Sequence, residues 1–181
     1  MKGINTLLRL FCLVSCLLIS AISADEDNAE YKVKAGYLYN FIKFIIWPAD
    51  NSPTFNICIL GQDPFGELLD PIEKRTAYGL PIKLFRLNTN NKTQACHIVF
   101  IGANNKTVFP LNDQPVIRHN GKALLVGEGE GFAEQGGMIG FVNRDGKIKL
   151  QINLKALQQS DLTVSAKLLE VAEIVKGGNR E

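Results

Sequence analysis

The sequence has few of the side chains from which active sites and metal centres are built. Its 181 residues include two histidines, four cysteines and one tryptophan. No serine lies in a Gly-x-Ser-x-Gly motif, and neither His97 nor His119 has an obvious serine or thiolate partner. Cys96 and His97, with the distant His119, do not have the spacing of a four-ligand zinc site. The sequence therefore predicts no catalytic group, no bound metal and no cofactor.

Nucleotide-binding motifs are absent as well. Gly127, Gly129 and Gly131 follow a predicted strand, but the dinucleotide fingerprint needs a further glycine where Phe132 or Glu134 stands. No phosphate loop ending in Gly-Lys-Ser or Gly-Lys-Thr occurs. Because glycine adopts backbone conformations that a Cβ disfavours, we interpret this stretch as a shaped structural or recognition loop.

The first residues have no apolar run long enough for a membrane-spanning helix. Basic residues precede an apolar stretch (10–22) of roughly 13 residues, whereas a spanning helix needs about 20. This pattern is typical of a secretory signal peptide, and we expect residues 1–24 to be removed by cleavage near Ala24. Alternatively, the Leu-Val-Ser-Cys sequence that ends at Cys16 is a lipoprotein box, with Cys16 as the acylated residue.

The predicted mature chain has no excess of charge of either sign. Removal of 24 residues from 181 leaves 157, which suits a single domain over residues 25–176 with a frayed, disordered tail at 177–181. Two of the 20 basic residues lie in the signal peptide, so 18 remain against 18 acidic residues. This balance gives little support for binding to nucleic acid or anionic lipid. Proteins or small molecules are the expected partners.

Only Cys58 and Cys96 remain in the predicted mature chain. An exported protein meets an oxidising compartment, and an even pair of cysteines there suggests a disulfide. The bridge would join adjacent strands and close a loop of 38 positions. The alternative is two buried free thiols.

Residues 31–47 have the apolar spacing of one helix, which Pro48 is expected to end. Its apolar residues form two stripes, one of Tyr31, Ala35, Leu38, Ile42 and Ile45 and the other of Tyr37, Phe41 and Phe44. Such width is typical of a helix inside a domain. The alternative is that the second stripe contacts another chain.

Short apolar runs beyond this helix alternate with connecting segments. The predicted buried strands are Phe55–Leu60, Ile82–Leu87, Ile98–Ile101 and Ala123–Val126. Residues 67–75 are predicted as a short helix bent at Pro71, and residues 108–120 as partly helical. This alternation is typical of a three-layer α/β fold with a mostly parallel sheet and flanking helices.

A different pattern ends the chain. Residues 138–142 and 147–153 flank a turn sequence, Asn-Arg-Asp-Gly, which predicts a C-terminal antiparallel hairpin. Apolar residues then recur at helical spacing and predict a closing helix; they are Val164, Leu168, Val171, Ala172 and Val175.

Four further residues have a structural and a functional interpretation. We interpret His97, beside a strand, as a structural residue, and Asp63, before a proline, as a turn former. Trp47 either anchors the first helix in the core or contacts a partner. Phe132 is either tucked under its glycine-rich loop or offered outward, and the sequence does not decide between these.

Four segments recur in the same order in one known family. They are YLYNFIKFIIWP (37–48), ICILGQDPFG (57–66), ACHIVFIG (95–102) and GFAEQGGMI (131–139). On these motifs the chain resembles the YfiR-like family of periplasmic regulatory proteins, from about Tyr31 to Val175. The resemblance therefore covers almost the whole mature chain.

Members of this family are periplasmic, soluble and often dimeric regulators. The best understood one restrains an inner-membrane diguanylate cyclase by contacting the cyclase's periplasmic sensor domain. Under envelope stress an outer-membrane lipoprotein related to peptidoglycan-binding proteins sequesters this repressor, and the cyclic di-GMP that is then made favours biofilm formation. The resemblance implies that this chain is a homodimeric signalling regulator with these two partners and without catalysis.

The resemblance also bears on single residues. Cys58 and Cys96 match positions that form a disulfide in the family, whereas a second cysteine pair found in some members is absent and Ile46 stands where a polar residue is common. We expect the partner-binding surface to include Phe132, Gly136, Gly137, Tyr37, Phe41 and Trp47. The competing hypothesis is a periplasmic module that captures a small ligand or supports an envelope complex, with no cyclase partner.

Overall fold

The computed structural model describes residues 28–88, 94–102 and 122–177. The predicted signal peptide (1–24) with Cys16 and the predicted partly helical segment (108–120) lie outside these ranges, as do the last four residues of the chain. Within the described ranges no helix is long and apolar enough to cross a membrane.

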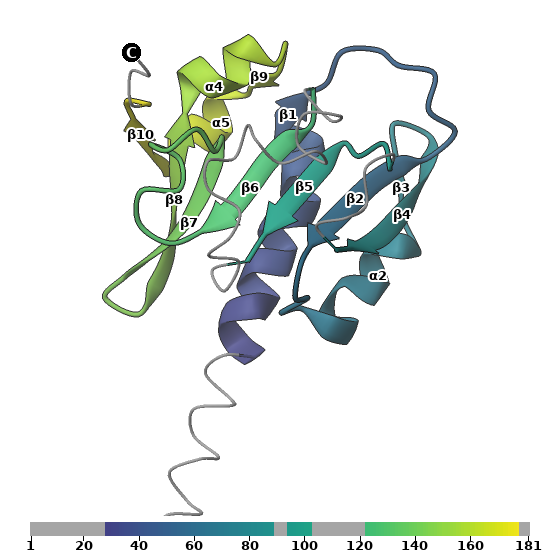
Figure 1. Ribbon diagram of the computed structural model, residues 1–181, viewed down its shortest axis with the longest axis horizontal. Helices are drawn as coiled ribbons and strands as arrows, with labels where there is room; N and C mark the ends of the chain where they lie inside the picture. The colour runs from purple at the N-terminus through teal and green to yellow at the C-terminus, as the bar shows by residue number, and fades with distance from the viewer. Residues whose placement is uncertain (1–27, 89–93, 103–121, 178–181) are drawn as a thin grey trace, which may run out of the picture.

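A mixed eight-stranded sheet forms the centre of the molecule (Figure 1). Its strands are β2 (Phe55–Leu60), β3 (Thr76–Ala77), β4 (Leu80–Leu87), β5 (Ile98–Ile101), β6 (Leu124–Glu128), β7 (Ile139–Arg144), β8 (Lys147–Asn153) and β10 (Ala172–Val175). The order across the sheet is β10-β8-β7-β6-β5-β2-β4-β3. Strands β4, β2, β5, β6 and β7 are parallel, and β8 is antiparallel to β7. The predicted α/β class with a mostly parallel sheet is confirmed.

Strands β2 and β5 lie at the middle of the sheet because they are apolar along almost their whole length, as strands covered on both faces must be. All six residues of β2 and all four of β5 are buried. Their parallel pairing runs from Ile57 opposite Ile98 to Leu60 opposite Ile101. The predicted limits of both strands are confirmed, and β4 and β6 differ from prediction by no more than two residues at either end.

The connection from β2 to β4 is helical, as predicted. A 3₁₀ turn, η1 (Gly66–Leu69), leads directly into α2 (Asp70–Glu73), and Pro71 lies in the first turn of α2. Proline fits there because the first backbone N–H groups of a helix have no partner within the helix. The predicted bend at Pro71 corresponds to the junction of the two turns.

The predicted hairpin at residues 138–153 is confirmed. Strands β7 and β8 pair antiparallel up to Arg144 opposite Lys147, which leaves Asp145 and Gly146 as a two-residue turn. Both turn residues have positive φ, 53° and 74°, the combination that a type I′ turn requires and that Asp-Gly tolerates.

The predicted closing helix is wrong. Only Ala166–Leu169 form a helix, α5, and the chain then continues as β10, which pairs parallel with β8 from Ala172 opposite Leu150 to Val175 opposite Asn153. The apolar spacing fits a helix, but the sheet offers β10 backbone partners that are more than 20 residues away in sequence. A second helix, α4 (Leu154–Gln159), was not predicted.

The N-terminal helix (residues 28–44) packs against one face of the sheet and crosses behind it in Figure 1. Leu38 from the first predicted stripe and Phe41 from the second are fully buried. Phe41 and Tyr37 lie 6.0 and 5.8 Å from Phe141 of β7, measured between ring centroids. Both stripes therefore pack within this chain.

The predicted end of this helix at Trp47 is also wrong. Helical structure ends at Phe44, and Ile45–Ile46 form a short strand, β1, that pairs antiparallel with β9 (Thr163–Val164). Ser165 N donates a hydrogen bond to Phe44 O at 2.8 Å. Pairing with residues 163–165 thus takes the place of the last helical turn that the sequence pattern predicted.

Candidate functional site

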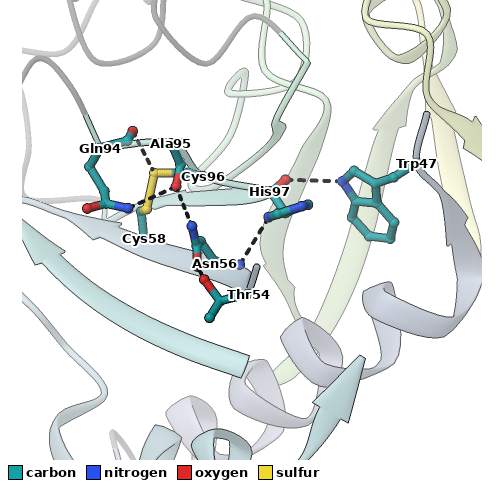
Figure 2. Close-up of a disulfide and its surroundings, with 8 residues drawn as sticks. All are labelled: Trp47, Thr54, Asn56, Cys58, Gln94, Ala95, Cys96 and His97. Atoms are coloured by element: carbon teal, nitrogen blue, oxygen red, sulfur yellow. Dashed lines mark hydrogen bonds between the residues drawn. A yellow bond between two sulfur atoms is a disulfide. The ribbon is translucent and has the colours of Figure 1, made fainter. Parts of the chain in front are cut away.

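A disulfide joins Cys58 and Cys96, as expected for an exported chain (Figure 2). Their Cα atoms are 5.9 Å apart. Cys58 lies in the middle of β2 and is fully buried, whereas Cys96 comes two residues before β5. The bridge therefore ties the approach to β5, rather than β5 itself, to the neighbouring strand.

Hydrogen bonds from Asn56 reinforce this tie. The Asn56 Nδ2 group donates to Ala95 O at 2.8 Å, and the Asn56 backbone N–H donates to His97 Nδ1 at 3.0 Å. His97 N in turn donates to Asn56 O at 2.8 Å. Figure 2 shows these side chains around the disulfide. We call Asn56, Cys58, Cys96 and His97 the strand clamp, because they hold β2 and the start of β5 together.

Trp47, which directly follows β1, supports the strand clamp. Its Nε1 group donates to His97 O at 3.2 Å (Figure 2). The ring meets Phe55 edge-on at 5.2 Å and Tyr78 at 6.3 Å between centroids. Trp47 therefore packs against the core, and its contact with a partner stays a prediction.

His97 is held as a neutral imidazole. It is 8% exposed, stacks on Phe55 at 4.4 Å, and accepts the Asn56 N–H at Nδ1, so Nε2 is the atom that carries the proton toward Asp50 Oδ2 at 3.1 Å. Burial lowers the pKa of His97, and the charge of Asp50 opposes this shift. The effect of burial on the pKa of His97 is larger than that of Asp50, because the Asp50 side chain is 48% exposed and its charge is screened by water. His97 is thus a structural residue.

The glycine-rich loop after β6 is built around the Phe132 ring. This side chain is 2% exposed. A Cβ placed on Gly127 or Gly137 would overlap the ring, so these two glycines provide the space that the ring occupies. Gly136, at φ 106°, turns the backbone between them. Phe132 is therefore tucked under its loop, and the glycine spacing has a structural cause.

Asn153 fixes this loop to the rest of the sheet. Its buried Nδ2 group donates to Ala133 O at 2.8 Å, and its Oδ1 accepts from Ala156 N at 3.0 Å, which caps the first turn of α4. One side chain at the end of β8 thus holds both the loop and the helix.

The sheet separates the predicted partner-binding residues into two groups. Gly127 and Gly140 are neighbours in the sheet and face Phe132, whereas the next residue of β7, Phe141, faces Phe41. Because successive side chains of a strand point to opposite faces, the loop and the N-terminal helix cover opposite faces. Gly137 and Phe41 are buried like Phe132, and Gly136, Tyr37 and Trp47 are partly buried. No single contact surface includes all six predicted residues.

Sequence reasoning missed a buried ion pair between the helix and the sheet. Lys34 is 4% exposed, and its Nζ pairs with Glu30 one turn before it and with Glu128 at the end of β6. Tyr31 Oη also donates to Glu128 at 3.4 Å. The sequence contains one signal of this pair: Lys34 lies on the same part of the helix as the apolar residues Ala35 and Leu38. A lysine buried there needs an acidic partner.

Asp63 forms the turn that the sequence predicted. Its Oδ1 accepts from Phe65 N at 2.8 Å, and its Oδ2 accepts from Arg86 Nε at 2.6 Å. Across residues 28–88, 94–102 and 122–177 no group of three or more His, Cys, Asp and Glu residues is placed to hold a metal ion.

Comparison with known proteins gives one family match. A family model described as YfiR/HmsC-like matches residues 31–173. No curated protein matches. Among solved structures, the ABC domain in complex with L-Trp from Streptococcus pneumonia is similar, with 16% sequence identity and a TM-score of 0.48. The match covers 76% of this chain and 59% of that one, less than two thirds of its length.

We predict that the mature protein has no free thiol and that Cys96→Ser lowers the free energy of unfolding by about 4 kcal/mol, the loop-entropy value for a separation of 38 residues. Thiol labelling of denatured, unreduced protein and urea unfolding measure the two quantities. Reduced wild-type protein is the matched control and should lose as much as the variant. Two titratable thiols per chain would contradict the prediction.

Phe132→Ala should lower the free energy of unfolding by about 3 to 5 kcal/mol, because it removes a buried ring and leaves a cavity between two glycines. Urea denaturation measures this loss. Glu134→Ala, at an exposed position of the same loop, is the control and should change stability by less than about 0.5 kcal/mol. Equal stability of the two variants would show that Phe132 does not fill the core.

Stability should fall as the pH drops below about 6.5, the ordinary pKa of histidine. The folded-state pKa of His97 is lowered, so in this range the unfolded chain binds more protons than the folded one. His97→Asn keeps an acceptor for the Asn56 N–H but does not titrate, so it should flatten the profile between about pH 5 and pH 8. Urea unfolding of both proteins across this range is the test. Identical slopes would assign the effect to other groups.

Proposed function

This chain belongs to the YfiR/HmsC-like family, and on that premise we propose that it represses an inner-membrane diguanylate cyclase from the periplasm. The observation that carries the proposal is the family match over residues 31–173. The family suggests a periplasmic regulator of cyclic di-GMP signalling in general. The finer proposal is that this chain binds the periplasmic sensor domain of the cyclase, acts as a homodimer, and is released when an outer-membrane peptidoglycan-binding lipoprotein sequesters it.

The Cys58–Cys96 disulfide supports the proposed location. Disulfides form and persist in oxidising compartments such as the periplasm, and this one lies in the centre of the sheet. The sequence of residues 1–24 also supports export, because basic residues precede a short apolar stretch, as in a secretory signal peptide.

A regulator of this kind needs no reaction of its own. It shifts the cyclase only by binding the inactive state of the sensor domain more tightly than the active state. A tenfold difference in affinity corresponds to about 1.4 kcal/mol, which a few well-placed contacts supply. The family is regulatory and non-catalytic, and the polar side chains of Asn56, Asp63 and Asn153 serve structural contacts in this chain.

Deletion of the gene should raise cellular cyclic di-GMP and biofilm mass in a cell that has the cyclase. Wild-type protein should reverse the rise, whereas a version that lacks residues 1–24 should stay in the cytoplasm and fail to reverse it. The rise should also disappear when the cyclase gene is deleted as well.

The direct measurement is isothermal titration of the purified mature chain with the periplasmic sensor domain of the cyclase. Saturable binding together with the genetic result supports the proposal. An unchanged cyclic di-GMP level on deletion would reject repression and leave a ligand-binding or envelope-complex module as the better hypothesis.

A further inference from the structure

Two segments far apart in sequence meet at the C-terminal half of the N-terminal helix. Tyr78 lies in the turn of the β3–β4 hairpin, and its Oη donates to Ile42 O at 2.8 Å and Ile45 O at 2.9 Å. Ile42 O is among the last carbonyls of the helix, which have no partner within it, and Ile45 O belongs to β1. Arg75, just before β3, reaches the Tyr39 ring on the same helix at 4.6 Å. The hairpin is thus fixed to the helix by both contacts.

Two cations converge on the Tyr39 ring. Lys43 Nζ lies 4.7 Å and Arg75 Cζ 4.6 Å from the centroid of the Tyr39 ring. A hydrogen bond from Arg75, followed by the charges of Arg75 and Lys43, lowers the pKa of Tyr39 against the effect of desolvation. Two positively charged groups therefore lie against one ring at the surface of the protein.

Arg75 differs in this respect from the other arginines whose positions the structure describes. Arg86 pairs with Asp63, and Arg144 pairs with Glu130 and Glu173, whereas no carboxylate of the described residues lies within ion-pair distance of Arg75 or Lys43. Nearby Glu73 is directed elsewhere, because its Oε1 accepts from Leu84 N at 2.8 Å. No described carboxylate therefore neutralises the charges of Arg75 and Lys43.

An aromatic ring is exposed beside these cations. Tyr78 is 65% exposed although both of its hydrogen bonds and its contact with Trp47 hold it in place. Its φ of 54° is a conformation that a bulky side chain seldom adopts. Exposed tyrosine and arginine held in fixed positions are typical of residues that contribute most to protein interfaces.

We propose that Tyr39, Lys43, Arg75 and Tyr78 form a docking surface for an acidic segment of a protein partner. Arg75 and Lys43 pair with carboxylates of that segment, and the Tyr78 ring is covered by an apolar side chain beside them. A small anion would pair with the cations but leave the Tyr78 ring exposed, so a polypeptide is the better occupant. This surface differs from the predicted one, in which Phe41 and Phe132 are buried.

The first test uses a partner-independent probe, a synthetic peptide that alternates glutamate with leucine, titrated into ¹⁵N-labelled mature chain. Amide shifts should change at the residues of the docking surface and weaken as salt concentration rises. A peptide that alternates lysine with leucine should produce no such change. Shifts confined to other residues, or equal shifts with both peptides, would overturn the proposal.

The second test uses the cyclase sensor domain and rests on the proposed function. Lys43→Glu with Arg75→Glu should weaken binding about tenfold or more, since like charges then face the acidic segment. Lys147→Glu with Lys149→Glu, at exposed positions of β8, makes the same change of charge elsewhere and should alter the affinity by less than about twofold. Melting temperatures of both variants show whether each is folded.

The two hypotheses fail in different ways. If wild-type protein does not bind the sensor domain, the proposed function fails, while the acidic peptide still tests the docking surface. If wild-type protein and the Lys43→Glu/Arg75→Glu variant bind the sensor domain equally well, the docking surface is overturned and the proposed function stands.

Discussion

The pairing of β2 with β5 is the contact on which the rest of the structure depends. β2 is the first strand of the eight-stranded sheet along the chain, and it lies between β4 and β5, so later segments add to the sheet on both sides of it. Parallel strands cannot be joined by a tight turn, and their pairing must be stabilised by residues that are distant in sequence. The strand clamp provides this where the chain enters β5: a disulfide, an asparagine amide and a neutral imidazole hold residues 95–97 against β2.

Local sequence patterns predicted the parts of the fold that are stabilised locally. Strands β2 and β5 are predictable because a short run of apolar residues, many of them β-branched, is typical of a buried strand in an α/β protein. The β7–β8 hairpin is predictable because Asp145 and Gly146 tolerate the positive φ angles of a tight turn. The errors occurred where a distant segment decides the outcome. Residues 172–175 have helical spacing but form β10 on β8, and Ile45–Ile46 leave the helix to pair with β9. Neither partner can be identified from the spacing of apolar residues.

The candidate site was predictable to a smaller extent. The cysteine pair followed from export and from the family resemblance, but the sequence did not show whether Phe132 points inward. That depends on Gly127 and Gly137 facing the same ring, and these residues belong to different segments of the chain. Lys34 was overlooked because the pattern of a helix shows which positions are buried, but not which distant carboxylate will pair with a buried lysine. In each case the missing information was a contact between two separate elements of the fold.

The same contacts limit where this protein can bind a partner. Phe132 and Phe41 lie in the core on opposite faces of the sheet. These two residues are distinctive in the sequence, but their side chains stabilise the fold and are not exposed to a partner. A regulator that acts through differential affinity benefits from a surface that is ordered before binding, because little conformational entropy is then lost on association. The junction of the N-terminal helix and the β3–β4 hairpin has this property: Tyr78 is fixed by two backbone carbonyls, and Arg75 and Lys43 are fixed against one ring, yet all three remain exposed. More of the contact energy at such a surface is available to distinguish one state of a partner from another.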